Sequence, residues 1–476
     1  MLASLKQHPF AKKIITFFHH RETLRSSFIL IFWMFASRGL GAFRTILVTR
    51  LSTLEADMLN GAMVITDNII TVFILGAVTT SILPQIIKLS VSSSDENRSR
   101  NQSTYLSWIM LILGGFLFIT SFVCILFSPQ ILQLLNQQLF AQIQQQGRGD
   151  DFVLLTRLML LVPTLFGVKS IFTAFLNAKK AFSIFALDGV IINLGFIFGL
   201  VVLYSFFGLS GVVWGNVLGM AVATTLFIWS ARKNGFRFQI ESFPELKKYL
   251  LQTAHLYFLW ILLIPGIRVA STIVAMNVDG ANGEITAVNL SLDIQSIFLG
   301  IVASIGSVVL PNMALLAAEK NHTRFWAYIF KYLRWIGFLS FFGAILTIAG
   351  TPLLIWLIQN SGILQNDSFL SIPENVQNVT LFASIGAFSL VFQSLIEILY
   401  RYFSSTENPY PPIIASIFGN ACAITTAFFF SSTWSAGLVA VVGFSINNVV
   451  VFFILLVAMY RLWRADHKYA LHKDTK

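Results

Sequence analysis

The chain has 476 residues, of which 56% are hydrophobic and 11% charged, a balance that a soluble globular protein of this length does not need. Its apolar stretches repeatedly exceed the roughly 20 residues that a helix requires to cross the hydrocarbon core of a bilayer. The net charge of +11 is scattered over short loops rather than gathered on one soluble face, which argues against a nucleic-acid partner.

Taken in chain order, the sequence begins with a basic segment, residues 1–26, which is predicted to be cytoplasmic and to precede a retained first span. Because backbone groups must be paired within the hydrocarbon core, each long apolar run is predicted to be a helix. A second basic segment, residues 461–476, follows the last span. The predicted fold is an all-α membrane protein with about twelve spans, at 27–50, 58–86, 104–128, 152–177, 181–206, 208–231, 249–276, 284–316, 326–350, 378–400, 410–431 and 434–460.

The distribution of basic residues predicts the orientation of these spans. With the N-terminus in the cytoplasm, the inner segments hold 23 of the 32 Lys and Arg residues, the outer loops hold 2 and the spans hold 7. Cytoplasmic loops of membrane proteins carry such an excess, so both termini are expected on the cytoplasmic side.

Two stretches of sequence recur at an offset of 227 residues. FILGAVTTSILPQ in the second span resembles FLGIVASIGSVVLPN in the eighth, and Pro84 matches Pro311. Asn193 and Asn420 occupy matching places in the fifth and eleventh spans. Each half holds six spans, so the halves are predicted to be parallel repeats around a central cavity. The predicted domains are a bundle at 27–231, a cytoplasmic linker at 232–248 and a second bundle at 249–460.

Ionisable side chains inside spans carry the functional expectations, because each costs roughly 2.5–3.5 kcal/mol to place in the membrane. Their depths along the helices predict three ion pairs, namely Arg44 with Asp67, Arg268 with Asp293, and Lys169 with Asp188. The first two pairs would either hold helices together or act as gates that break and re-form during transport. For the third pair, on consecutive helices, a structural role is at least as well supported as a role in transport.

Arg38 lies near mid-depth of the first span without a predicted partner. An arginine stays charged and presents a planar fork of donors that matches phosphate oxygens. Gly39 and Gly41 beside it would allow the helix to bend or another backbone to approach closely. These features favour contact with an anionic substrate, at the base of a cavity between the halves, over a structural role.

Several motifs spread over nearly the whole chain are similar to one family. FASRGLGAFR in the first span carries Ser37, Arg38, Gly41 and Arg44 in the pattern S-R-x-x-G-x-x-R. The segments GAVTTSILP, LNAKKAFSIFALDGVIIN and LYRYFSSTENPYPP follow later in the chain, and the acidic Asp57 precedes the second span. Together they resemble the MurJ (MviN) family, lipid II flippases of the multidrug/oligosaccharidyl-lipid/polysaccharide exporter superfamily.

The resemblance implies a flippase that moves an undecaprenyl diphosphate-linked precursor across the bacterial inner membrane, with membrane lipids and cell-wall synthesis enzymes as further partners. Arg38 and Arg44 would contact the diphosphate, and Asp57 would belong to the outer gate. Two further arginines of the family pattern are absent from the second and eighth spans. Arg268 on the seventh span is the candidate replacement.

Other functions remain open. A cation-coupled exporter of small molecules or polysaccharide-linked lipids, similar to the multidrug and toxin extrusion branch, would use acidic residues such as Asp67 and Asp293. An intramembrane transferase would need a His/Asp or paired-carboxylate constellation, which the spans lack. A scaffold that gathers envelope enzymes would use its buried charges only to hold helices together.

No cofactor is expected. The two cysteines, Cys124 and Cys422, lie in apolar stretches that suggest neither a disulfide nor a metal site. The membrane potential or a monovalent cation would supply the energy for transport.

Overall fold

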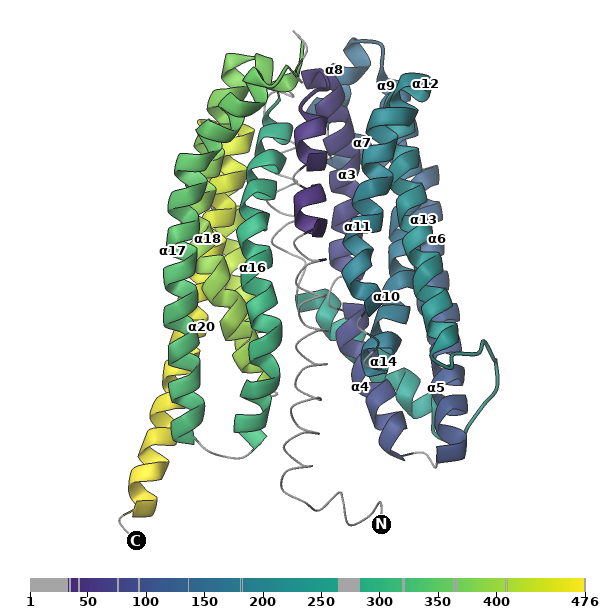
Figure 1. The fold of residues 1–476 in the computed structure, drawn as a ribbon, viewed down its shortest axis with the longest axis vertical. Coiled ribbons are helices and arrows are strands. Elements are labelled where there is room, and N and C mark those ends of the chain that lie inside the picture. Colours follow the sequence, from purple (N-terminus) through teal and green to yellow (C-terminus); the bar gives the residue numbers. More distant parts are fainter. Residues whose placement is uncertain are drawn as a thin grey trace, which may run out of the picture.

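The computed structural model describes Trp33 and residues 36–41, 43–74, 77–92, 95–135, 137–179, 181, 183–263, 283–318, 322–362, 364, 367–406, 408 and 410–474. In this part of the chain the regular elements are helices, apart from an isolated antiparallel bridge between Ser52 and Ser368. Figure 1 shows two upright bundles side by side, the first built from α3 to α14 and the second from α16 to α20.

The first bundle packs around one continuous apolar core, in which Phe152, Phe172 and Phe175 are almost fully buried. Helical residues 36–41 and 43–48 precede its labelled helices. These are α3 (Thr53–Phe73), α4 (Ala77–Ser92), α5 (Asp95–Ile109), η1 (Met110–Gly114), α6 (Gly115–Leu126), α7 (Ser128–Leu135), α8 (Gln137–Gln145), α9 (Gly149–Met159), α10 (Val162–Ala178), α11 (Ser183–Phe198), η2 (Gly199–Leu203), α12 (Tyr204–Phe207), α13 (Leu209–Lys233) and α14 (Leu246–Leu263).

The second bundle has two apolar clusters of its own, one around Tyr402 and Phe403 and the other around Phe369 and Phe382. Each bundle therefore buries most of its apolar side chains within itself, while Ile285 of α16 joins the core of the first bundle and Ile46 packs on the cluster around Phe369. Its helices are α16 (Glu284–Ala318), α17 (His322–Asn360), η3 (Phe369–Ser371), α18 (Pro373–Ser405), α19 (Tyr410–Phe430) and α20 (Ala436–Asp474).

Within the described residues, 9 helices are long and apolar enough to cross a membrane. They correspond to the predicted spans three to six and eight to twelve. The predicted second span is divided between α3 and α4, while the first and seventh spans lie partly outside the described residues. The apolar segment after residue 350 continues α17 through Pro352 rather than forming a separate element.

The internal repeat governs where the helices begin. Three helices of the second bundle each start 227 residues after a helix of the first, with Asp95 matched by His322, Ser183 by Tyr410, and Leu209 by Ala436. The repeat found in the sequence is thus a repeat of helices, as parallel halves require.

Local signals set the ends of the helices that hold the site. Ser52 caps α3, because its Oγ accepts a hydrogen bond of 3.4 Å from the backbone N–H of Glu55. The Ser-x-x-Glu spacing is that of a capping box. Gly208 separates α12 from α13 with a φ of 57°, in the left-handed region that glycine adopts without strain.

The two ends of the molecule differ. Figure 1 places the α4–α5 turn and the end of α20 at one end, here called the base, and α8 and α12 at the opposite end, here called the top. Helix α14, which begins the second half of the sequence repeat, packs on the first bundle. Its Tyr257 donates to the carbonyl of Phe73 at 2.6 Å, and its Thr253 lies 2.6 Å from the hydroxyl of Tyr105.

Candidate substrate site and closure between the bundles

Arg38 lies between the two bundles. The preceding residue, Ser37, is fixed to the first bundle, since its carbonyl accepts a 3.0 Å hydrogen bond from Asn193 of α11. The Arg38 side chain reaches α16 of the second bundle, where a Cβ added to Gly300 would come within 2.6 Å of its Nε. Arg38 is exposed, and no carboxylate among the described residues comes within 4.0 Å of its guanidinium. An exposed arginine at this place presents charge-assisted donors of the kind that suit an anion.

Arg44 pairs across the bundles, which corrects the predicted pairing with Asp67. Its Nη2 lies 3.9 Å from Oδ2 of Asp293 on α16, and the same oxygen accepts a 2.7 Å hydrogen bond from Thr45. The arginine also lies over the ring of Phe196, at 5.0 Å from the centroid. The position of a residue along its span predicts its height in the membrane, but it does not predict which other helix lies beside it. Asp293 lies at a height that Arg44 can reach. Asp67 is exposed on α3 and has other contacts.

The space around Arg44 and Asp293 is narrow. A cavity of about 20 Å³ lies there, lined also by Asn60, Met63 and Phe196. That volume admits about one water molecule. The bundles therefore nearly meet at this level, toward the top.

Asp57 closes the top by capping a helix of the other bundle. Its carboxylate accepts hydrogen bonds from the backbone N–H of Gly283 at 2.9 Å, from that of Thr286 at 3.3 Å and from the Thr286 hydroxyl at 2.6 Å. These N–H groups lie at the start of α16. The first N–H groups of a helix have no hydrogen-bond acceptor within the helix, and the N-terminal end of a helix attracts negative charge. Gly283 has a φ of 90°, which glycine alone adopts readily. Asp57 is completely buried.

The same closure shows where the repeat axis lies. Asn60 donates a 2.9 Å hydrogen bond to Thr286, and both this bond and the Asp57–Gly283 bond join residues 226 apart. That separation is close to the repeat offset, so α3 and α16 face each other at nearly equivalent positions. Two-fold related elements meet in this way.

Further hydrogen bonds join the two bundles at the outermost part of the top, here called the rim. The carbonyl of Leu51 accepts a 3.0 Å hydrogen bond from the backbone of Phe369, and Asn375 donates to the Thr53 hydroxyl at 3.2 Å. The isolated bridge joins Ser52 to Ser368 at the same rim. The N-terminal end of α3 is thus tied to the start of α18.

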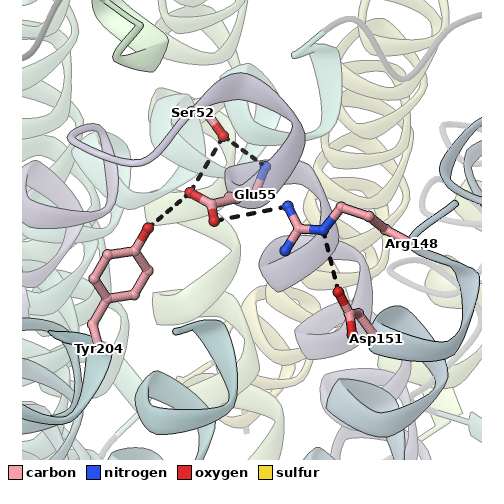
Figure 2. Close-up of polar contacts among 5 residues, drawn as sticks. All are labelled: Ser52, Glu55, Arg148, Asp151 and Tyr204. Carbon is pink, nitrogen blue, oxygen red and sulfur yellow. Dashed lines mark hydrogen bonds and ion pairs between the residues drawn. The ribbon is translucent and has the colours of Figure 1, made fainter. Parts of the chain in front are cut away.

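Glu55 ties the closing helix to the rest of the first bundle (Figure 2). It accepts a 3.0 Å hydrogen bond from the hydroxyl of Tyr204 and lies 3.8 Å from Nη1 of Arg148. Arg148 also binds Asp151 at 3.2 Å. Three separate helical segments are joined here, which holds the start of α3 in place.

Lys169 and Asp188 form the predicted ion pair inside the first bundle. The lysine Nζ lies 2.9 and 2.8 Å from the two carboxylate oxygens, and its side chain is 3% exposed. It also lies over the ring of Phe166, at 4.4 Å from the centroid. The pair joins α10 to α11 within one bundle rather than across the two.

Arg268 lies outside the described residues, so its predicted pairing with Asp293 stays a prediction. Sequence reasoning did not single out Asn60, Thr286, Glu55 or Arg148. For Asn60 and Thr286, the sequence repeat could have pointed to the contact. The two polar residues stand at nearly equivalent positions of two repeat-related spans. No pattern in the sequence links Glu55 to Arg148, which depend on the loop between α8 and α9.

The contact between Arg44 and Asp293 can be tested by exchanging its charges. We expect Arg44→Asp and Asp293→Arg each to impair transport, because each places two like charges across the narrow cavity, and the double exchange to restore much of it. Arg44→Asp with Asp67→Arg is the matched control and is not expected to recover activity. Recovery in the control pair alone would contradict the observed pairing. The measurement is the lipid translocation that the resemblance implies, in reconstituted vesicles.

Two helical bundles that share a repeat, stand side by side and meet at one end define the protein as a multi-pass, all-helical membrane protein of two repeated halves. A structure described as lipid II flippase MurJ in an inward closed conformation matches with a TM-score of 0.73 at 18% identity, covering 91% of this chain and 87% of that one. An inward-facing MATE family multidrug transporter matches with a TM-score of 0.70 at 15% identity, over 93% and 99% of the two chains. An outward-facing structure of a MATE family transporter matches at 0.64 and 13% identity, over 93% and 96%.

The family model for the lipid II flippase MurJ matches residues 51–475, and the chain therefore belongs to that family. No curated protein sequence matches significantly. The predicted all-α fold, with about twelve spans in two repeats, is confirmed, as is the predicted family. The family is one of membrane transporters, which removes the transferase alternative.

Proposed function

We propose that this protein moves an undecaprenyl diphosphate-linked cell-wall precursor, lipid II or a close relative, from the cytoplasmic to the outer leaflet by alternating access. The observation that carries the proposal is the exposed guanidinium of Arg38 between the bundles. A diphosphate needs charge-assisted donors to leave water, and an arginine fork supplies two at once. Family membership supports the lipid-linked substrate.

The hydrogen bonds at the top support the alternating-access step. Asp57, Asn60 and Thr286 join the bundles near one end, whereas Arg38 lies deeper between them. In our proposal this is the state that loads substrate from the base. Breaking the cap on α16 while the bundles close at the base would release the headgroup at the top.

The base is assigned to the cytoplasm by the charge distribution in the sequence, and the membrane is the bacterial inner membrane by family. An anion that moves outward then gains about 2.3 kcal/mol per charge for each 100 mV of inside-negative potential. This would drive transport without a cofactor, and coupling to a monovalent cation is the alternative drive. Cell-wall synthesis enzymes would supply and consume the substrate.

Arg38 is the residue to test. We expect Arg38→Ala to lower translocation at least about tenfold, because a charge-assisted hydrogen bond contributes roughly 1.5–3 kcal/mol. Arg38→Lys should be the milder change, since it keeps the charge and loses the fork. The measurement is a leaflet-accessibility assay on protein reconstituted in vesicles.

The matched control is Arg334→Ala, which removes an exposed arginine from α17 and should leave translocation unchanged. Normal translocation by a stably inserted Arg38→Ala protein would overturn the proposed site.

A further inference from the structure

A large apolar groove opens on the first bundle, away from Arg38. One wall is formed by α5, η1 and α6, the other by α14, and the cavity has a volume of about 1000 Å³. This is the upper end of the range for ligand sites, roughly 300–1000 Å³. Ile112, Phe116 and Leu251 line it and are 55%, 44% and 60% exposed within the described residues.

The polar groups on the walls already have partners. The Thr253 hydroxyl is paired with Tyr105, Tyr257 donates to the carbonyl of Phe73, and the Trp108 indole donates to the carbonyl of Glu241 at 3.0 Å. A bound molecule therefore finds no free hydrogen-bond donor among these groups. A polar ligand would give up its hydrogen bonds to water and gain none from these groups in return. The walls suit a hydrocarbon chain.

One charged side chain lines the described part of the groove, and it is the cation Lys247 near the start of α14. The mouth beside it is held in place by the segment after α13. The backbone N–H of Gln239 donates to Ser107 of α5 at 3.1 Å, and that of Arg237 donates to Ser103 at 3.3 Å. The groove thus has a cation at its mouth and an apolar interior.

The groove follows α14, which runs obliquely up from the base in Figure 1. From Lys247 to Tyr257 is ten residues of this helix, or about 15 Å at 1.5 Å per residue. On the opposite wall, η1 is a π-helix, a feature that frequently occurs at functional sites, and it places Ile112 and Leu113 on the groove.

We propose that this groove binds the isoprenoid chain of a polyprenyl phosphate-type lipid in the leaflet at the base, with its phosphate beside Lys247. The inference rests on the proposed function, and it assigns a loading site to the substrate before its headgroup reaches Arg38. The anionic headgroup and the long apolar chain are the two features that the groove recognises.

The probe is a polyprenyl phosphate carrying a photoactivatable diazirine on its chain, added to the full-length protein in phosphatidylcholine vesicles. We expect crosslinks in peptides from α5 to α6 and from α14. Ala254→Trp fills the groove from an exposed position and should lower labelling about tenfold. This is the effect expected if roughly two methylene groups of the lipid chain can no longer be buried in the groove. Lys247→Gln should lower it about fivefold.

Two matched controls accompany these variants. Ala349→Trp adds the same bulk to an exposed position of α17, and Lys248→Gln removes the neighbouring lysine, which does not line the groove. Both should label as the unmodified protein does. Equal labelling of all variants, or equally effective competition by phosphatidylglycerol, would overturn the proposal.

The result is separable from the Arg38 test. If Arg38→Ala loses translocation and keeps its labelling, both the loading site and the proposed function are supported. If Ala254→Trp loses labelling and still translocates normally, the groove is not a loading site, although Arg38 could still be the substrate site.

Discussion

Replacing Asp57 by alanine will shift the protein toward a state that is open at the top. The change leaves two backbone N–H groups and the Thr286 hydroxyl without their acceptor at the start of α16. Each buried group left unsatisfied costs about 1–3 kcal/mol. A loss of about 3 kcal/mol in total changes the ratio of closed to open molecules by roughly a hundredfold.

The measurement is the distance between spin labels at the top, attached to cysteines at Gln146 and Asn360 in a Cys124→Ser, Cys422→Ser background. The distance distribution should lengthen in Asp57→Ala. Asp57→Asn should have a smaller effect, because its amide oxygen keeps one acceptor. Asp150→Ala, which removes an exposed carboxylate near the start of α9, is the matched control. An unchanged distribution in Asp57→Ala would show that the cap does not hold the top closed.

Removing Lys169 will destabilise the first bundle. Lys169→Met leaves the carboxylate of Asp188 without its partner. Breaking a fully buried pair costs roughly 3–5 kcal/mol, and the cost here should be below that range because the Asp188 side chain is 27% exposed. We expect a lower midpoint of thermal unfolding in detergent. Lys233→Met, at an exposed position of the same bundle, should stay within about 0.5 kcal/mol of the parent.

The double variant Lys169→Met, Asp188→Leu distinguishes a structural pair from a transport site. Replacing both charges by apolar groups is often neutral or stabilising, so thermal stability should return. If the pair serves only to join α10 to α11, translocation should return as well. A stable double variant that does not transport would assign the pair a role in the transport cycle.

Some features of the site followed directly from the residues. Arg38 was predicted to lie between the halves, and the structure places it against Gly300 of the opposite bundle. The contact of Lys169 with Asp188 was also predicted, because consecutive helices of one bundle are neighbours and the two residues lie at one depth. Positions along two consecutive helices are sufficient to predict such ion pairs.

Other contacts could not be derived in this way. Arg44 was expected to meet Asp67 on the next span, and it meets Asp293 of the other bundle instead. Asp57 was assigned to the outer gate by family resemblance, but its partners at the start of α16 were not predicted. These contacts depend on how the two bundles are turned toward each other.

By itself, the sequence determined that the chain spans a membrane, how many times, and that it does so in two related halves. Long apolar runs can only be helices in lipid, and an offset of 227 residues repeats them in the same order. Only the tertiary structure decided which charged groups meet, where the top closes and where an apolar groove remains. Those outcomes depend on rotation and distance between helices, which hydrophobic periodicity does not specify.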